Sequence, residues 1–426
     1  MEVKKVLVVL GMPLEYSASV TFQNRQLIRG FFELGFTVDV IQPTANINSN
    51  FYDETLKDIF SCINKVFYTS FRGFYSKFIG INKKIPRVEV ESPETKSKSF
   101  RNSIKIRFFM FSKRILLRLL NALDIDGALL LNTSIPKGVN FSEYDYIISS
   151  SDPVAAHKIA MKIVKRWKDK NNKLKWIQYW GDPLFTASFN SGEIYKKFMA
   201  YIIERKLIKN GDLIVYASPL TLNEQKSTFR FFANKMTFSH QVAEFGKSDF
   251  ERQSSSDKSS RRRIRVGYFG DYMKDNRNIE PFYNAARYFP DIEFYIVGNS
   301  DIKLEPLENL VLIKQRLSYG KIKYLEENCD ILFAVTNKIG TAIPAKIYYW
   351  TGYLSKPIIV ALDGPFKDEL EHYFSNFERY IVCENNEEDI IKALQDAIKQ
   401  VKSGIVCKLT PELTEKFMVQ RILNSI

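Results

Sequence analysis

Two stretches of the sequence carry residues that could hold a phosphate-bearing ligand. The first is "GTAIPAKIYYWTGYLSKPII", residues 340–359, where Gly340, Thr341, Pro344 and Lys346 come before a run of aromatic residues. A helix start has free N–H groups and partial positive charge, a proline fits the first turn because it has no N–H to lose there, and a lysine adds a full charge. This stretch predicts an anion-binding helix start, followed by a buried helix and a buried strand.

The second stretch is "RVGYFGDYMKDNR", residues 265–277. Gly270 lies just past a strand-like run, where a residue without a side chain lets backbone amides approach an anion, and Lys274 and Arg277 follow within reach of the same place. Together the two stretches predict a diphosphate site that needs no metal ion. The structural alternative is that a glycine and a lysine near a helix start serve only the turn.

The elements that must position these residues alternate between strand-like and helix-like segments. Strand-like runs at 4–11 and 36–43 flank a helix-like segment at 24–35 that ends on a glycine, which is the order that builds a parallel sheet. Further strand-like runs lie at 144–151, 174–180, 212–218, 264–272, 292–300, 309–315, 330–336 and 356–363, with helix-like segments at 152–168, 278–289, 319–329 and 410–426. We therefore predict an α/β protein with two Rossmann-like doubly wound domains that face each other across a cleft and bind ligands at the carboxyl ends of their strands.

The domain boundaries follow from one break in the alternation. "GKSDFERQSSSDKSSRRR" is polar, serine-rich and without apolar periodicity, so it is typical of an interdomain linker. The last segment carries a threonine and a proline, Thr410 and Pro411, suited to a helix cap and a first helical position. The predicted organisation is an N-terminal domain at 1–245 with an insertion at about 50–125, a linker at 246–263, a C-terminal domain at 264–410, and a helix at 411–426 expected to pack back on the N-terminal domain.

Composition limits the function classes. The 426 residues exceed what one core usually serves, and 45% hydrophobic with 26% charged residues is ordinary for a globular protein. Four cysteines and three histidines are scattered, so neither a disulfide framework nor a zinc site is expected. Every apolar run falls short of the roughly 20 residues of a membrane span, and the opening "MEVKKVLVVLGMPLEY" is too short in its apolar part for a signal peptide. We expect a cytoplasmic protein.

The net charge of +14 is concentrated in one segment. Residues 65–118 hold 14 Lys and Arg against three acidic residues, interleaved with many aromatic residues. Apolar residues recur there at helical spacing, which is typical of a basic amphipathic helix on an anionic membrane surface, where each cation contributes about 1 kcal/mol. The membrane-contacting residues that we predict are Arg107, Phe108, Phe111, Lys113, Arg114 and Arg118.

Two other interpretations of this segment remain. The helix could pack on its own domain with a solvated basic face. Binding to nucleic acid is disfavoured because no recognised nucleic-acid module accompanies the charge. We therefore expect an anionic membrane surface as a partner and no nucleic acid.

The sequence resembles glycosyltransferases of the GT-B fold, and most closely the family 4 type that builds bacterial surface polysaccharides. "YDYIISSSDPVAAHKIAMKIVKR" followed by "LKWIQYWGDPL" resembles the N-terminal pattern of that family, a strand ending in Ser and Pro, a helix with His, and a strand into Asp-Pro. "RVGYFGDY", "IEFYIVGN", "CDILFAV" and "IPAKIYYWTGYLSKPII" resemble, in order, the C-terminal segments that hold a sugar nucleotide. The resemblance runs from the first strand to Asp363 and leaves out the insertion.

What the resemblance implies is transfer of a sugar from a nucleotide diphosphate, a UDP-sugar or GDP-sugar, to an acceptor, with no cofactor besides this substrate. Arg277 and Lys346 would neutralise the leaving diphosphate. Arg316 and Leu317 would lie near the base, and Asn299 near the sugar or phosphates. The other donor-side residues are Gly270, Lys274, Gly340 and Thr341, and the acceptor-side residues are Gly11, His157 and Asp182.

Asp182, in "YWGDPL", is the residue that we predict to orient or deprotonate an acceptor hydroxyl. The alternative is that it forms a turn or cap ahead of Pro183. His157, the second predicted catalytic residue, could equally be a helix residue packed beneath the loop.

One departure from the family pattern concerns the donor site. Family 4 members usually carry a glutamate a few residues after the motif lysine, and often a second one eight residues earlier. The matching positions here hold Tyr349 or Trp350, and Thr341 or Ala342. No acidic residue lies between Pro344 and Leu362, so the ribose contact must come from elsewhere and the stereochemistry of transfer stays open.

Three functions follow. The first is an active glycosyltransferase on the inner membrane surface that extends a lipid-linked saccharide acceptor in cell-surface polysaccharide synthesis, such as capsule or O-antigen. The second is a non-catalytic GT-B scaffold for other transferases, which the missing carboxylates favour and the retained cations disfavour. A sugar-nucleotide epimerase of the same fold is the third, and it leaves the basic insertion unexplained.

Overall fold

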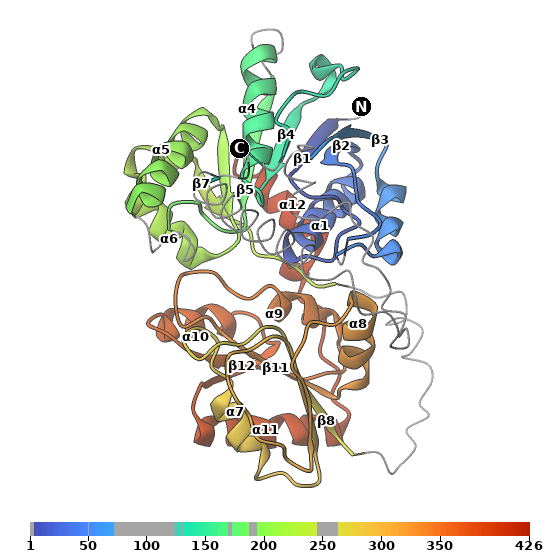
Figure 1. Cartoon of the computed structure of the whole chain (residues 1–426), viewed down its shortest axis with the longest axis vertical. Helices are drawn as coiled ribbons and strands as arrows, with labels where there is room; N and C mark the ends of the chain where they lie inside the picture. Colours follow the sequence, from blue (N-terminus) through green and yellow to red (C-terminus); the bar gives the residue numbers. More distant parts are fainter. Residues whose placement is uncertain are drawn as a thin grey trace, which may run out of the picture. The chain divides into compact units, whose positions relative to one another are not determined.

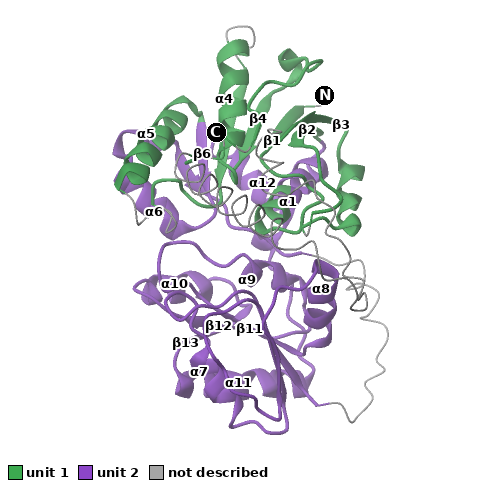
Figure 2. Cartoon of the chain, viewed as in Figure 1, with its two compact units in different colours: residues 1–24, 36–212 green, residues 25–35, 213–426 purple. Residues whose placement is uncertain are grey.

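The protein is described from a computed structural model (Figure 1). The described residues are 4–49, 51–71, 124, 125, 127, 129, 131–168, 173–186, 194–244 and 263–426. The six predicted membrane residues, Arg107 to Arg118, and almost all of the predicted linker lie outside them. The chain forms two compact units, residues 1–24 with 36–212 and residues 25–35 with 213–426 (Figure 2). The domain boundaries inferred from the sequence stay predictions.

The first sheet has seven strands in the order β3-β2-β1-β4-β5-β6-β7. The pairs β1–β2, β2–β3, β1–β4, β4–β5 and β6–β7 are all parallel. Its strands are β1 Lys5–Leu10, β2 Thr37–Pro43, β3 Lys65–Thr69, β4 Tyr146–Ser150, β5 Lys175–Trp180, β6 Leu213–Tyr216 and β7 Met236–Phe238. The helices between them are α1 Ser19–Glu33, α4 Ala155–Trp167, α5 Ile194–Asn210 and α6 Pro219–Thr228, with 3-10 turns η1 Glu54–Cys62, η2 Phe141–Glu143 and η4 Arg230–Lys235.

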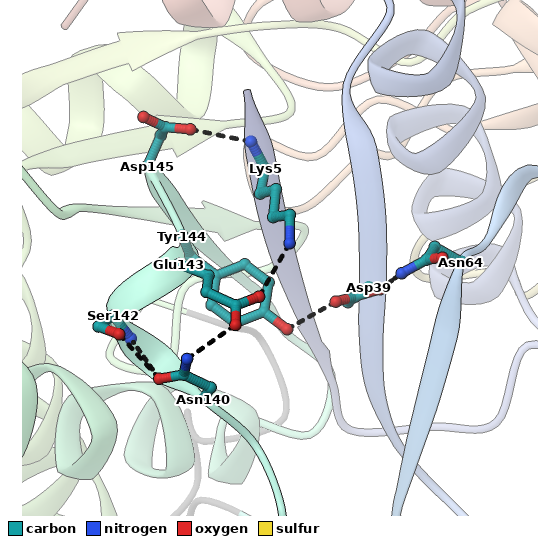
Figure 3. Close-up of polar contacts among 8 residues, drawn as sticks. All are labelled: Lys5, Asp39, Asn64, Asn140, Ser142, Glu143, Tyr144 and Asp145. Carbon is teal, nitrogen blue, oxygen red and sulfur yellow. Dashed lines mark hydrogen bonds and ion pairs between the residues drawn. The ribbon is translucent and has the colours of Figure 1, made fainter. Parts of the chain in front are cut away.

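A polar network joins the segments that lead into β1 and β4, at the amino ends of these strands (Figure 3). Lys5 donates its backbone N–H to Asp145 and its ammonium to Glu143, both at 2.8 Å. The buried carboxylate of Asp39 accepts from the Tyr144 hydroxyl at 2.7 Å and from the Asn64 amide at 2.8 Å. These bonds hold β2 and the segments before β3 and β4 in place at the amino edge of the sheet. Functional loops of such sheets lie at the opposite, carboxyl edge.

The second sheet has six strands in the order β10-β9-β8-β11-β12-β13, and every neighbouring pair is parallel. Its strands are β8 Arg265–Phe269, β9 Glu293–Val297, β10 Leu310–Ile313, β11 Ile331–Val335, β12 Ile358–Leu362 and β13 Tyr380–Glu384. Its helices are α7 Glu280–Ala286, α8 Tyr319–Asn328, α9 Lys346–Tyr349, α10 Lys367–Ser375 and α11 Glu387–Ser403, with the 3-10 turn η6 Trp350–Gly352. The chain ends with the 3-10 turn η7 Pro411–Leu413 and α12 Glu415–Leu423.

The central strands β8, β11 and β12 of the second sheet are buried on both faces, whereas the edge strands β10 and β13 are only partly buried. Alternate residues of each strand point to opposite sides, so a continuous apolar run fills two cores. Phe333 of β11 packs with α7 and α11 on one face and stacks on Phe282, with ring centres 4.0 Å apart. Leu332 packs with Trp350 and Phe374 on the other face. The prediction of two Rossmann-like α/β domains is thereby confirmed for the architecture of the sheets, and their mutual arrangement stays a prediction.

Two predicted helices differ from the structure. The aromatic helix after Pro344 is only the four residues of α9, continued by the 3-10 turn η6. Gly352 ends that turn, where a Cβ would lie 2.3 Å from the backbone oxygen of Glu244. The predicted length of the helix was therefore wrong, and a single helical turn sums few peptide dipoles. Anion binding at this helix start stays a prediction.

The second correction concerns the C-terminal helix, which does not begin at Thr410 and Pro411. Pro411 opens the short turn η7, and Thr410 makes no capping bond with its side chain. Thr414 caps α12 instead, accepting from the N–H of Phe417 at 3.4 Å. The helix packs against Gly30 of α1, where a Cβ would lie 2.3 Å from the backbone oxygen of Glu415.

Candidate functional site

The second sheet reverses its strand order between β8 and β11. From β8 the chain proceeds outward to β9 and β10, whereas from β11 it proceeds to β12 and β13 on the other side. The loops that leave the carboxyl ends of β8 and β11 therefore lead to opposite sides of the sheet. Such a switch point is where open α/β sheets bind ligands. Residues 270–278 and 336–345 form these two loops.

The two loops are joined by hydrogen bonds across the switch point. The Arg277 guanidinium donates from Nε to the Asn337 side-chain oxygen at 2.6 Å, and Asn337 in turn donates to the backbone oxygen of Ala342 at 2.9 Å. Lys338 donates its N–H to the backbone oxygen of Asn276 at 2.8 Å. Among the described residues, no carboxylate lies within ion-pairing distance of Arg277. Its hydrogen bond to the neutral Asn337 orients the guanidinium, and the Asp271 carboxylate interacts with it at longer range.

Gly270 and Gly298 bring the ends of β8 and β9 into backbone contact. A Cβ on Gly298 would lie 1.9 Å from the backbone oxygen of Gly270, closer than any side chain allows. Beyond them, the Asp271 carboxylate accepts from the N–H of Asn299 at 3.0 Å and pairs with Arg316. Burial acts to raise the pKa of Asp271, but the bond from Arg316 holds that pKa below its usual value. Arg316 is therefore already engaged by a carboxylate.

The remaining predicted donor residues lie on the same edge in different environments. Lys274 is exposed, and Leu317 is partly buried against the core under α8 and α10. Gly340 is exposed with φ of 84°, a left-handed conformation that favours glycine. The Lys346 ammonium lies 3.3 Å from the Glu326 carboxylate and 5.9 Å from the centre of the Phe269 ring. Lys346 is thus held against α8 rather than extended into solvent.

Thr341 contacts a carboxylate that no local sequence pattern predicted. Its hydroxyl lies 3.1 Å from a carboxylate oxygen of Glu224 and 3.0 Å from the Thr221 hydroxyl, both on α6. The Ser218 hydroxyl donates to the backbone oxygen of Thr341 at 2.8 Å. An acidic group is therefore present beside Thr341, at one of the positions where the family pattern has glutamate and this sequence has none.

A cavity of about 380 Å³ opens beside Glu224. Small-molecule sites are commonly about 300 to 1,000 Å³. One part of its wall is polar and another is apolar. Its lining residues are Leu220, Asn223, Glu224, Ser227, Thr341, Phe366 and Glu369.

The first sheet has its own switch point, between β1 and β4. Gly11 follows β1, and a Cβ there would lie 2.4 Å from the Pro153 ring, so only glycine fits. Asp152 and Asp182 follow the neighbouring strands β4 and β5. Asp182 is exposed and Asp152 is partly buried. Burial, and then the negative charge of Asp182, raises the pKa of Asp152 to about 7.

His157 lies in the core of the same unit. Its side chain is fully buried, its Nδ1 is 2.7 Å from the Ser149 hydroxyl, and its ring packs on Trp180 with centres 4.4 Å apart. Burial lowers the pKa of His157 to about 3, so the ring is neutral at pH 7. The structure brings Gly11, Asp152 and Asp182 to one edge and places His157 beneath it.

Sequence reasoning missed Asp152 and Glu224. Asp152 could have been predicted from the sequence, because "SSSDP" repeats the arrangement of "YWGDP", in which a strand is followed by Asp-Pro. Glu224 was not, because 117 positions separate it from Thr341.

Two parallel-sheet α/β Rossmann-like domains in one chain, each with loops gathered at a switch point, match the architecture of GT-B structures. Among solved structures, the N-terminal domain of trehalose-6-phosphate phosphatase from Candida albicans matches 100% of this chain and 97% of its own, with a TM-score of 0.53 and 8% identity. A glycosyltransferase from Rickettsia africae ESF-5 matches 100% and 98%, with a TM-score of 0.49 and 10% identity. At 8% identity the likeness to the Candida albicans domain concerns the fold alone. No protein-family model matches the sequence, and neither does any curated protein.

Proposed function

We propose that this protein is a glycosyltransferase that moves a sugar from a nucleotide diphosphate to an acceptor hydroxyl. The observation that carries the proposal is Arg277, a cation held at the switch point of the second sheet by the neutral Asn337. A donor diphosphate gains negative charge as its bond to the sugar breaks. A positioned cation that needs no reorganisation stabilises that charge.

The donor would lie along the carboxyl edge of the second sheet. Backbone amides near Gly270 and Gly340 would approach the phosphates, with Arg277, Lys274 and Lys346 as the cations. Arg316 and Leu317 would lie by the base, and Asn299 by the sugar or phosphates. We propose that Lys346 exchanges its contact with Glu326 for one with the donor. The donor's negative charge must offset the cost of this exchange, because the Glu326 side chain is only 6% exposed and loses its cation.

The cavity beside Thr341 is the proposed place for the donor sugar. The carboxylate, amide and hydroxyl groups of its lining can accept hydrogen bonds from sugar hydroxyls, and the amide and hydroxyl groups can also donate to them. Leu220 and Phe366 offer apolar surface to one face of a sugar ring. Glu224 would then supply from α6 the carboxylate that residues 344–362 lack. This assigns α6 a direct part in choosing the sugar.

The acceptor would lie at the carboxyl edge of the first sheet, by Asp182 and Asp152. A carboxylate whose pKa is near 7 can take a proton from an attacking hydroxyl and release it again at neutral pH. Asp152 is therefore our choice for the base, with Asp182 orienting the acceptor and keeping the pKa of Asp152 high. His157 would support this edge from below.

The family 4 resemblance and the basic aromatic segment at 65–118 lead us to propose a lipid-linked saccharide as the acceptor. The protein would then be peripheral on the inner face of the cell membrane, in cell-surface polysaccharide synthesis. Among the helices that the structure describes, none combines the length and apolarity needed to cross a bilayer.

The first test is a thermal-shift screen of the full chain with UDP, GDP, CDP and dTDP. A ligand at about 100 times its dissociation constant stabilises the native state by roughly 2.7 kcal/mol, a shift of several degrees that one nucleotide should produce. The same screen with EDTA tests metal independence, for which no change is expected. No shift with any nucleotide, in a protein that melts cooperatively, would contradict the proposal.

A second function is favoured by one observation. Lys346 and Arg316 are both paired with carboxylates, Glu326 and Asp271, so two of the donor-side cations are neutralised in place. This suits a GT-B scaffold that no longer binds a donor. Such a scaffold predicts that Arg277→Ala leaves the association with other transferases intact and that no nucleotide binds.

A further inference from the structure

Helix α5 of the first unit is apolar on a face that packs against nothing in the described structure. The relative exposures of Ile194, Tyr195, Phe198 and Ile202 are 91%, 57%, 61% and 42%. These exposures show that the four side chains are not part of the core, because large apolar side chains in a core are nearly completely buried. Ala200, Leu207 and Ile208 on the other side of the same helix are at most 1% exposed and provide its packing. The helix therefore carries two apolar faces, and only one of them serves the fold.

The exposed face continues into a basic one. Residues 198, 202, 205 and 209 follow at intervals of four, three and four, so they lie along a single stripe of the helix. Phe198 and Ile202 form its first half, and Arg205 and Lys209 form its second half, with the exposed Lys206 beside them. An apolar anchor is thus followed within two turns by three cations on the same side.

Within α5 itself, no acidic side chain lies on the exposed face. The only acid of α5, Glu204, is fully buried and accepts from the N–H of Phe185 at 2.6 Å. The sign of the face agrees with the net charge of +14 of the whole chain. A partner that covers this face must therefore offer apolar depth and negative charge at one surface.

An anionic bilayer offers both properties. Aromatic and aliphatic side chains insert among headgroups and the upper acyl chains, while lysine and arginine remain at headgroup level beside acidic lipids. We propose that the face of α5 formed by Ile194, Tyr195, Phe198, Ile202, Arg205 and Lys206 docks the first unit on an anionic membrane surface. This docking face is formed by other residues than the basic segment at 65–118, and it stands on different observations. It rests on the proposed function only in that it would bring the acceptor edge near lipid-linked substrate.

The test is sedimentation of the full chain with vesicles of phosphatidylcholine alone and of phosphatidylcholine with about one third phosphatidylserine. We expect binding to the anionic vesicles that weakens as salt rises. Phe198→Ser with Ile202→Ser, and separately Arg205→Glu with Lys206→Glu, should each weaken binding at least tenfold. Matched controls are Phe231→Ser, which removes an exposed aromatic residue from η4, and Lys392→Glu with Lys399→Glu on α11.

Three results would overturn the docking face. Wild-type protein that stays in solution with anionic vesicles would exclude it. Unchanged binding by both α5 variants would assign any membrane contact elsewhere in the chain. A dimer of the wild-type protein that the α5 variants convert to monomer, without a change in vesicle binding, would assign the face to a second copy. The nucleotide thermal shift of each variant keeps this inference separate from the proposed function, since α5 variants should retain any shift that the wild-type protein shows.

Discussion

The carboxylates of Asp152 and Asp182 follow neighbouring parallel strands of one sheet, and the charge of Asp182 adds to burial in raising the pKa of Asp152 to about 7. Two carboxylates with different environments and one raised pKa are a common basis for acid and base roles at neutral pH. The proposed roles of these two carboxylates can therefore be tested by measuring how activity and stability depend on pH.

The transfer rate should rise with pH through about 7, because Asp152 accepts a proton only when it is ionised. Asp182→Asn removes the negative charge and should move this rise to lower pH, whereas Asp152→Asn should abolish it and lower the rate about 100-fold or more. The measurement is the initial rate between pH 5 and 9. An identical profile in Asp182→Asn would show that the two carboxylates do not interact.

The same pKa predicts a stability effect that needs no substrate. The folded state holds the Asp152 proton more tightly than the unfolded chain, whose value is near 3.8, so Asp152 lowers stability as pH rises from about 4 to 7. Asp152→Asn removes this loss. The melting temperatures of variant and wild type should therefore agree best near pH 4, and the variant should melt higher at pH 8. A constant difference across this range would contradict the raised pKa.

Arg277→Ala should weaken binding of a nucleoside diphosphate roughly 10- to 100-fold, the equivalent of losing one charged hydrogen bond. Arg277→Lys should recover part of the affinity, because it keeps the charge and loses the planar fork. The control is Arg287→Ala, which follows α7 and precedes the amino end of β9, at the opposite edge of the same sheet. Calorimetric titration with the nucleotide from the screen measures all three. Equal affinity of Arg277→Ala and wild type would remove the diphosphate site from this switch point.

Glu224→Gln tests the sugar cavity separately from the diphosphate site. The change keeps the shape of the side chain and removes the charge beside Thr341. We expect about tenfold weaker binding of the nucleotide-sugar, with binding of the free nucleoside diphosphate unchanged. Glu388→Gln on α11 is the matched control, since Glu388 is exposed and pairs only with Lys392 of its own helix. Parallel losses for sugar nucleotide and free nucleotide would show that Glu224 acts on the fold rather than on the sugar.

The sheets could be predicted from the sequence because each strand is a short apolar run between polar or glycine-containing segments, a pattern that survives without tertiary information. Gly270 and Arg277 could be assigned to one edge from the sequence because both closely follow the same strand-like run, and parallel sheets bind ligands at the carboxyl ends of their strands. Glu224 was beyond prediction, because only tertiary structure brings α6 to the loop after β11. The length of α9 was also beyond prediction, since the close approach of Gly352 to Glu244 that ends the turn is a contact across 108 positions of chain.

Gly298→Ala should destabilise the second unit by about 3 kcal/mol, because its Cβ would meet the backbone oxygen of Gly270 and a backbone atom cannot move aside as a side chain can. Gly320→Ala is the matched control. Gly320 lies in α8 with open space around its added Cβ, so alanine should stabilise by roughly 0.5 kcal/mol through its better helix propensity. Urea unfolding of both variants measures the difference. A mild effect of Gly298→Ala would mean that β8 and β9 separate more easily at their carboxyl ends than the contact indicates.

The start of the C-terminal helix gives a prediction that separates the sequence pattern from the structure. "TPELTEKF" contains two threonines, and the proline after Thr410 made it the better cap from sequence. In the structure the Thr414 hydroxyl accepts from the N–H of Phe417, and Thr410 has no capping bond. Thr414→Ala should therefore cost about 1 kcal/mol of unfolding free energy, while Thr410→Ala should stay within about 0.5 kcal/mol of wild type. Denaturant unfolding of the two variants shows which threonine caps the helix. A larger loss for Thr410→Ala would mean that the helix begins one turn earlier in solution, and that the contact of Glu415 with Gly30 is made from within the helix rather than at its start.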